Sequence, residues 1–573
     1  MATTLTIAPE ILEAFLSSFR YQLPRGEGVH TASSTTPTRV DLDRELGGIL
    51  RTPDAIAAHE LARQIRSHLN RISLFHRLPT EVVSIIFHLA VHNDQLRQYE
   101  PAKLAIRISS VSQLWREIAT QMCSTLWTKL DALPAPLLDL FLSRSGSAPL
   151  EIVFTTWTAP STVSALHFFE RIVPYIHRWR DCRIFYDVSK NRDVLSLLQE
   201  ASAPAPQLEV LRLHFVAMHG PPLEWPDPFR GITPRLCTLD CDFYIPLSSP
   251  IFRGLTKLHL SCIEYPEPDP IHHLLGILGL CLLLESISFV DLIFLATPIA
   301  HASDLSITLR YLQKLYIFQE LGAQWVQSHF LPRIIVPASC ILKITANVRH
   351  DDELRHLIPQ RSNFLPSLPD IQSVRTLHIY YPRVDYNISV RGKMTAGDQN
   401  AFALTFLYPT EPNNPGDLDG CARIISSFRT SLPLPLLEQV AFSRGQRNDS
   451  DPIPSLESFF RAHPTLKTIA LDGYWPWDRV LELFVAAPIR ELCPLLQAMY
   501  LAPAQGLDEK MLLEAVKSRT APAVDSSHLR GVTALQHLFF DPRCDYYEHP
   551  SASALSTLQN HVTVDFKECP MGG

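Results

Sequence analysis

LEVLRL, at residues 208–213, is the first of ten hexapeptides that have apolar residues at their first, fourth and sixth positions. Alternating apolar residues are typical of a strand with one buried face, so each hexapeptide predicts a short strand. Most of the hexapeptides start 28 to 30 residues apart, and two intervals, of 62 and 63 residues, are about twice as long. The other nine begin at Leu236, Leu255, Leu284, Leu312, Val374, Leu437, Leu466, Leu496 and Leu535.

Helix-forming stretches separate several of these hexapeptides, as in residues 271–283, 480–487 and 509–518, and a proline often precedes the next strand. A unit of helix, turn and short strand resembles the leucine-rich repeat, whose units bury their apolar positions only against their neighbours. This resemblance implies an α/β solenoid with a parallel strand ladder on its concave side.

The array is expected to be irregular. Regular leucine-rich repeats carry Asn or Cys in the turn after the strand, where these side chains satisfy backbone groups. Residues 391–420 and 445–454 are predicted to be exposed loops that interrupt the array. At the turn position where regular leucine-rich repeats carry Asn or Cys, the first five repeats of this chain have Val216, Tyr244, Ile263, Leu292 and Glu320.

The composition of the 573 residues narrows the classes of protein. With 46% apolar and 19% charged residues, the chain is too hydrophobic to be disordered, and its length allows three or four domains or one long array. The longest uncharged apolar run, residues 274–284, is well short of the roughly 20 residues that span a bilayer. Residues 131–573 carry a net charge of −9, which disfavours nucleic-acid binding. We therefore expect neither a membrane span nor a nucleic-acid partner.

The chain has no recognisable catalytic, metal or cofactor motif. It contains no glycine-rich phosphate loop, no His-Glu-x-x-His and no Gly-x-Ser-x-Gly. His272 and His273 are adjacent, so they point to different faces of a helix, and Cys237 and Cys241 are expected to be buried thiols. Residues 417–420 predict a turn. The eleven cysteines, with no export signal at the start, predict a reduced, intracellular protein. The lack of the motifs above predicts no bound metal or cofactor.

Two helices are predicted ahead of residue 78. Residues 9–23 form an amphipathic pattern, and the polar residues 24–39 predict a flexible linker. A second helix is expected over residues 52–72, with Thr52 as its cap and Pro53 as its first residue. Its apolar stripe fits either a helix packed on its neighbour, which we favour, or a dimerising helix.

Three short amphipathic helices are predicted between Leu78 and Leu130. Pro79 would begin the first helix, with Glu81 near the positive end of its dipole. Three such helices bury little surface alone, so an apolar face should remain for a partner. The apolar positions are Val82, Ile85, Ile86 and Leu89 in the first helix, Leu104, Ile108, Val111 and Trp115 in the second, and Leu126, Trp127 and Leu130 in the third.

This segment resembles an F-box. The resemblance is carried by LPTEVVSIIFHLA at residues 78–90, VSQLWREIA at 111–119 and STLWTKL at 124–130. It implies a three-helix module that binds a Skp-type adaptor and, through it, the cullin and RING subunits of a ubiquitin ligase. SRSGSAPLEIVF at 143–154 and HRWRDCRIF at 177–185 are similar to fungal, mainly basidiomycete, F-box proteins with degenerate leucine-rich C-terminal regions.

The resemblance also implies the adaptor-binding residues. Leu78 and Pro79 would enter an apolar groove of the adaptor. Four others, Ile86, Phe87, Val111 and Trp115, would either contact the adaptor or hold the helices together. Residues 92–106 are longer and more polar than the minimal motif has at this place. The complete predicted set is Leu78, Pro79, Val82, Ile86, Phe87, Val111 and Trp115.

The predicted fold class is a multidomain α+β chain in which an all-α three-helix F-box module precedes an irregular α/β leucine-rich-repeat-like solenoid. The expected parts are residues 1–50 (helix and linker), 51–77 (helix), 78–130 (F-box) and 131–573 (solenoid).

The predicted function is that of a non-enzymatic substrate receptor of an SCF-type cullin-RING ligase, in the cytoplasm or nucleus, which presents an unidentified protein for ubiquitin-dependent degradation. The alternatives are an interaction scaffold that binds the adaptor without ligase function, and an enzyme with an unrecognised site.

Overall fold

The computed structural model describes the chain from residue 74 onward, with gaps. The predicted helices over 9–23 and 52–72 and the linker over 24–39 lie outside the described residues. The described residues are 74–92, 101–157, 163–187, 193–200, 203–216, 224–295, 306–320, 324–347, 354, 357–358, 371–381, 387–394, 401–407, 420–445, 451–486, 492–520, 533–543 and 548–568.

The chain divides into two compact units. Unit 1 comprises residues 1–184 and 196–198, and unit 2 comprises residues 185–195 and 199–573. The segment with the F-box-like motifs lies in unit 1, and all ten hexapeptides lie in unit 2.

Unit 1 begins with short helices that pack on one another. Ser112 adopts an extended conformation, and its hydroxyl accepts a hydrogen bond from the backbone N–H of Trp115, so a new helix starts here. The indole N–H of Trp127 donates to the carbonyl of Ala119 at 2.8 Å. The elements are η1 (Leu74–Arg77), α4 (Thr80–His92), α5 (Pro101–Ser110), α6 (Gln113–Gln121), η3 (Ser124–Trp127) and β1 (Lys129–Leu130).

The rest of unit 1 adds a small parallel sheet. Strand β1 pairs in parallel with β2 (Leu150–Thr155), and β2 pairs with β3 (Trp179–Asp187), which continues into unit 2. Buried Arg178 donates to the carbonyl of Ala148 and to the hydroxyl of Ser145, which satisfies polar groups beneath the sheet. The helical elements here are α7 (Ala135–Ser145), α8 (Ala165–Ile172) and η4 (Val173–Arg178), and α9 (Asp193–Glu200) is divided between the two units.

In unit 2, each of the ten hexapeptides leads into a strand that begins two residues after its first residue. The prediction of ten short strands is confirmed. The strands are β4 (Val210–Val216), β5 (Thr238–Cys241), β6 (Lys257–Ser261), β8 (Ser286–Val290), β11 (Lys314–Gln319), β14 (Thr376–Tyr381), β17 (Gln439–Arg444), β18 (Thr468–Gly473), β19 (Ala498–Pro503) and β20 (His537–Phe540).

Four further strands complete the sheet of unit 2: β13 (Ile341–Asn347), β15 (Ile388–Lys393), β16 (Phe402–Leu407) and β21 (Thr563–Phe566). The lateral order is β4-β5-β6-β8-β11-β13-β16-β15-β14-β17-β18-β19-β20-β21. Only β15 runs antiparallel to its neighbours in this order. Strands β15 and β16 occupy residues 391–393 and 402–407 of the segment 391–420, so the prediction of an exposed loop is wrong for these residues.

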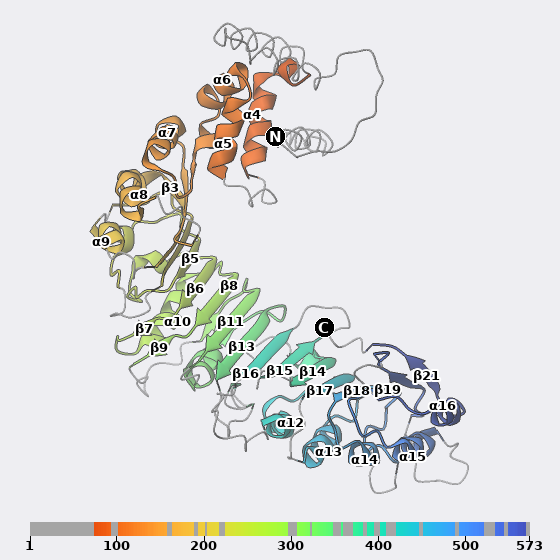
Figure 1. The fold of residues 1–573 in the computed structure, drawn as a ribbon. Coiled ribbons are helices and arrows are strands. Elements are labelled where there is room, and N and C mark those ends of the chain that lie inside the picture. The colour runs from red at the N-terminus through yellow and green to blue at the C-terminus, as the bar shows by residue number, and fades with distance from the viewer. Residues whose placement is uncertain are drawn as a thin grey trace, which may run out of the picture. The chain divides into compact units, whose positions relative to one another are not determined.

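Helices cover one face of this sheet, as Figure 1 shows for α12 to α15 beside β17 to β19. Between β5 and β6, whose hexapeptides start 19 residues apart, the connection forms a short 3₁₀ helix, η6 (Pro250–Phe252), in place of an α-helix. The helices are α10 (Pro270–Leu280), α12 (Gly420–Ser431), α13 (Ile453–Ala462), α14 (Trp477–Glu482), α15 (Glu509–Thr520) and α16 (Ala552–Gln559).

Smaller elements connect these strands. Strand β7 (Glu264–Tyr265) pairs with β9 (Ile293–Phe294), and β10 (Ile307–Thr308) pairs with β12 (Ile334–Ile335), both in parallel. The remaining turns are η5 (Pro228–Gly231), η7 (Val326–Phe330), η8 (Leu331–Arg333) and η10 (Ile371–Ser373).

Alternate residues of each strand form the other face, which we call the open face because its side chains stay partly exposed. The fifth residues of the hexapeptides lie side by side across it, in a line that we call the central row. From β4 to β21 this row consists of Arg212, Asp240, His259, Ser288, Tyr316, Lys343, Ala403, Arg391, His378, Ala441, Ala470, Tyr500, Phe539 and Asp565.

The predicted fold class is wrong. The architecture is α/β, with seventeen strands in one mostly parallel sheet, and the described residues contain no separate all-α three-helix module. The predicted second helix is divided at Ser112 into α5 and α6. The predicted third helix is the short 3₁₀ helix η3 followed by β1, whose pairing with β2 makes residues 129–130 part of the sheet. Among the described residues, none of the helices is both long enough and apolar enough to span a bilayer.

Candidate functional site

An apolar stripe runs along the outer side of α4. Val82, Ile85 and Leu89 are spaced at i, i+3 and i+7, so they lie on one face of the helix. Ile85 is 44% exposed and Leu89 is 41% exposed, and Val82 is half-buried. We call these three residues the α4 stripe.

The α4 stripe continues toward the start of the helix. Pro79 is exposed and Leu78 is partly exposed, directly ahead of the first residue of α4. Val111, at the break between α5 and α6, is also partly exposed. Four of the seven predicted adaptor-binding residues are therefore accessible to a partner: Leu78, Pro79, Val82 and Val111.

The other three predicted residues are buried among the helices. Ile86 is 2% exposed, Phe87 is fully buried, and Trp115 is 6% exposed. The ring centroids of Phe87 and Trp115 are 4.9 Å apart, and Phe75 lies 6.0 Å from Trp115 on another side. In this structure these three side chains hold the helices together, which is the second of the two roles considered for Ile86, Phe87 and Trp115.

Polar contacts fix α4 relative to the elements that follow it. The ammonium group of Lys129 donates to the carbonyl of Val91 in the last turn of α4 at 3.2 Å, where a cation also offsets the helix dipole. The imidazole of His88 lies 3.3 Å from the hydroxyl of Thr125. These contacts hold the helix that carries the α4 stripe in a defined orientation.

Ile85 and Leu89 are apolar positions of the predicted first helix, but they are not among the predicted binding residues. The family motif draws attention to the Ile86-Phe87 pair. Burial shows that the neighbouring helical positions face outward. The four apolar residues of this helix are spaced at i, i+3, i+4 and i+7, which places them on one helix face, so the sequence carried no signal of which of them would stay exposed.

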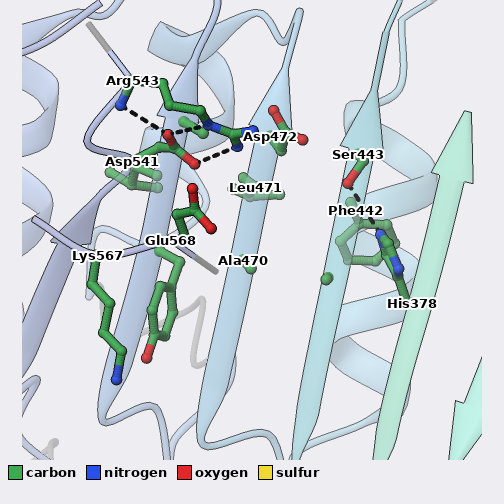
Figure 2. A pocket seen from close by; sticks show the side chains of 14 residues that line it. His378, Phe442, Ser443, Ala470, Leu471, Asp472, Asp541, Arg543, Lys567 and Glu568 are labelled. Carbon is green, nitrogen blue, oxygen red and sulfur yellow. Dashed lines mark hydrogen bonds and ion pairs between the residues drawn. The ribbon is translucent and has the colours of Figure 1, made fainter. Parts of the chain in front are cut away.

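The second site is a pocket of about 190 Å³ on the open face of unit 2. Its floor is made by Ala441 and Ala470, adjacent members of the central row, and each is only 3% exposed. His378 lies beside Ala441 in the row, and Tyr500 lies beside Ala470. We call this pocket the hollow. Figure 2 shows most of its lining: His378, Ala441, Phe442, Ser443, Ala470, Leu471, Asp472, Tyr500, Leu501, Ala502, Asp541, Arg543, Lys567 and Glu568.

Charged groups gather at the rim of the hollow. Arg543 donates two hydrogen bonds to the carboxylate of Asp541, at 2.7 and 2.6 Å. Partial burial favours the neutral form of Asp541, but the hydrogen bonds and the charge of Arg543 outweigh it and lower the pKa of this carboxyl. Asp541 is therefore ionised and paired.

His378 is held neutral. Its Nε2 atom lies 3.1 Å from the hydroxyl oxygen of Ser443. Burial, with smaller contributions from the charges of Arg391 and Lys393, lowers the pKa of His378 to about 4. One side of the hollow thus presents an uncharged imidazole at neutral pH.

A separate histidine cluster lies on strands β4 to β6 of the same face. The Nε2 atom of His214 is 2.8 Å from a carboxylate oxygen of Asp240, and its Nδ1 atom is 3.7 Å from Asp242. Burial opposes the charged form, but these two carboxylates outweigh it and raise the pKa of His214 to about 9. The ring of Phe185 stacks on that of His214 at 4.9 Å. His259, 3.7 Å from Asp240, has a lowered pKa mainly because it is buried.

The residues considered earlier for metal binding do not converge. The rings of His272 and His273 on α10 are 6.4 Å apart, and Cys241 is a buried free thiol, whereas Cys237 is only partly buried. Burial raises the pKa of the Cys241 thiol well above its usual value. Within the described ranges, no group of three or more His, Cys, Asp or Glu side chains could hold a metal ion.

Comparison with known proteins does not assign the chain to a family. No protein-family model matches it, and no curated protein sequence matches it. The functional argument therefore depends on the α4 stripe, the open face and the motifs of the sequence.

Proposed function

We propose that the chain is a non-catalytic substrate receptor of an SCF-type cullin-RING ubiquitin ligase. A Skp-type adaptor binds the α4 stripe together with Leu78 and Pro79, and a protein target binds the open face of unit 2. The chain contributes binding and geometry, and the cullin and RING subunits join through the adaptor. A location in the cytoplasm or nucleus belongs to the same proposal.

The observation that carries the proposal is the exposed α4 stripe within the F-box-like segment. Ile85 and Leu89 expose more than two fifths of their surface although buried residues lie beside them on the same helix. Full burial of such a side chain is worth about 1.5 to 3 kcal/mol, and a groove that covers the exposed two fifths of both residues gains a corresponding part of that energy from each. An aliphatic surface of this kind suits an apolar protein groove.

The open face supports the assignment of a protein target. Its central row includes aromatic and arginine side chains, among them Arg212, Tyr500 and Phe539, and these residue types are enriched at protein interfaces. The acidic balance of residues 131–573 disfavours a polyanion.

The first experiment is affinity purification of the full chain from cells with proteasome activity blocked. The wild type should bring down a Skp-type adaptor with cullin and RING subunits. Leu78→Ala combined with Pro79→Ala should lose all three, with unchanged circular dichroism. A matched control is Leu282→Asp with Leu283→Asp, since these residues are 72% and 59% exposed in unit 2.

Retention of the adaptor by the Leu78→Ala, Pro79→Ala chain would contradict the proposed binding surface. The scaffold alternative gives a different result, in which the adaptor is present but cullin and RING subunits are absent. The receptor function is supported when the wild type and the control both bring down all three subunits and the Leu78→Ala, Pro79→Ala variant brings down none of them.

A further inference from the structure

We propose that the hollow receives an arginine side chain of the protein target. This inference rests on the proposed function in one respect: the open face is taken as the surface that binds the target. It adds the chemistry of the group recognised there.

The size of the hollow fits one long side chain. Its volume of about 190 Å³ is smaller than the 300 to 1,000 Å³ typical of small-molecule sites. The hollow exists because Ala441 and Ala470 occupy successive places in the central row, where most neighbouring strands carry larger side chains. Access is from the open face, so a side chain can enter while its backbone stays outside.

The walls of the hollow suit a flat cation. The ring of Tyr500 stacks on that of Phe539, with centroids 4.3 Å apart and planes inclined by 15°. This stacking holds the Tyr500 ring as a rigid wall beside Ala470. Guanidinium groups stack on aromatic faces and are more weakly hydrated than ammonium groups, which favours arginine over lysine in a partly enclosed site. The neutral imidazole of His378 on the other side adds no repulsion.

The charges of the rim complement a cation. The lining contains three carboxylates, Asp472, Asp541 and Glu568, and two cationic groups, Arg543 and Lys567. Two hydrogen bonds already bind Arg543 to Asp541. Within the lining the balance is one negative charge in excess, so a bound arginine neutralises the lining, whereas a bound carboxylate adds to the excess. Arg391 and Lys393, whose charges act on His378, lie outside the lining.

The same sheet contains an internal example of the contact. On β11 and β13, Tyr316 and Lys343 are neighbours in the central row, and the ammonium nitrogen of Lys343 lies 5.0 Å from the centre of the Tyr316 ring. On β18 and β19 the corresponding neighbours are Ala470 and Tyr500. Beside Tyr316, the side chain of Lys343 fills the space in the row. Beside Tyr500, the equivalent space is the hollow, and the target supplies the cation there.

The test uses the full chain and four blocked tripeptides, acetyl-Ala-X-Ala-amide, in which X is arginine, lysine, citrulline or glutamate. Citrulline has nearly the shape of arginine without its charge. Binding is measured by saturation-transfer NMR over a millimolar concentration range. The arginine peptide should bind at least threefold more tightly than the lysine peptide and at least tenfold more tightly than the other two.

Two variants locate the binding. Ala470→Leu fills the hollow and should abolish the signal of the arginine peptide, whereas Ala403→Leu makes the same change elsewhere in the central row and should not. Glu568→Gln, at an exposed position, should weaken binding at least threefold without any risk to folding. Thermal unfolding of each variant verifies that the chain is folded.

Three results would overturn the inference: equal binding of arginine and citrulline, tighter binding of lysine than of arginine, or full binding by a folded Ala470→Leu chain. None of these results affects co-purification of the adaptor. If the chain fails to bind the adaptor but still binds the arginine peptide in the hollow, only the ligase role is refuted. The failure of the proposed function and the failure of this inference are therefore distinguishable.

Discussion

The α4 stripe and the hollow, the two proposed binding surfaces, differ in their chemistry. The stripe is aliphatic, and Ile85 and Leu89 offer area without a polar group, so any groove of matching shape and apolar character can cover it. The hollow is small and bounded by aromatic rings and charges, so as a binding site it would discriminate by charge and shape. A constant partner suits the first surface and a selected target suits the second.

The largest expected effect is on the free energy of unfolding, and it comes from removing the buried side chain of Trp115, which supports the helix of the α4 stripe. Trp115→Ala leaves a cavity between Phe75 and Phe87, and the loss of a buried aromatic side chain costs about 3 to 5 kcal/mol in the free energy of unfolding. Urea denaturation followed by circular dichroism measures this loss. Trp157→Ala is the control in the same unit, because Trp157 is 65% exposed and its loss should cost less than about 0.5 kcal/mol. Similar costs for the two variants would refute the packing role of Trp115.

A smaller effect is the pH dependence of the free energy of unfolding that His378, in the hollow, causes. The folded-state pKa of His378 is lowered to about 4, so between pH 6.5 and 4 the unfolded chain binds a proton that the folded chain does not. Stability therefore falls as the pH falls through this window, by on the order of 3 kcal/mol. His378→Gln cannot titrate and should show a shallower decline in urea denaturation at each pH. Equal slopes for the two proteins would show that His378 is not held neutral.

The smallest effect has the opposite sign and lies on the same face outside the hollow. The pKa of His214 is raised to about 9, so its stabilising contribution is complete below pH 6.5 and is lost as the pH rises through 9. Asp240→Asn should flatten this alkaline decline, by less than about 1 kcal/mol because the site is partly exposed. The measurement is the free energy of unfolding between pH 7 and 9.5. A decline of unchanged steepness in the variant would contradict the assigned ion pair.

The strands could be predicted from the sequence wherever the repeat was intact. Strand β13 was missed because Ser339 stands where the other hexapeptides begin with Leu or Val, and β21 was missed because His561 stands there. Strands β15 and β16 follow no hexapeptide, and the antiparallel course of β15 depends on long-range pairing that no local pattern reveals.

The helical segment was predicted less well. Local periodicity indicated helices, but it could not show that Ser112 would start a new one, or that residues 129–130 would pair with β2 instead of ending a helix. Tertiary pairing overrode the helical pattern at that point. The error in fold class follows from these two places.

The hollow could have been found by aligning the hexapeptides. Their fifth positions face the open side, and successive hexapeptides have His378, Ala441, Ala470 and Tyr500 there. The rim residues Asp541, Arg543 and Glu568 follow no such pattern, because they lie in segments after β20 and β21. The floor was therefore predictable from the sequence, whereas the charges around it required the structure.

The most direct test of the central claim is isothermal titration calorimetry of a purified Skp-type adaptor into the full chain. Ile85→Ala and Leu89→Ala should each weaken binding by about 2 kcal/mol, close to 30-fold, and Ile85→Asp with Leu89→Asp should abolish it. The Leu282→Asp, Leu283→Asp control should bind like the wild type. Undiminished affinity in the folded α4 variants would contradict the assignment of the α4 stripe as the adaptor-binding surface.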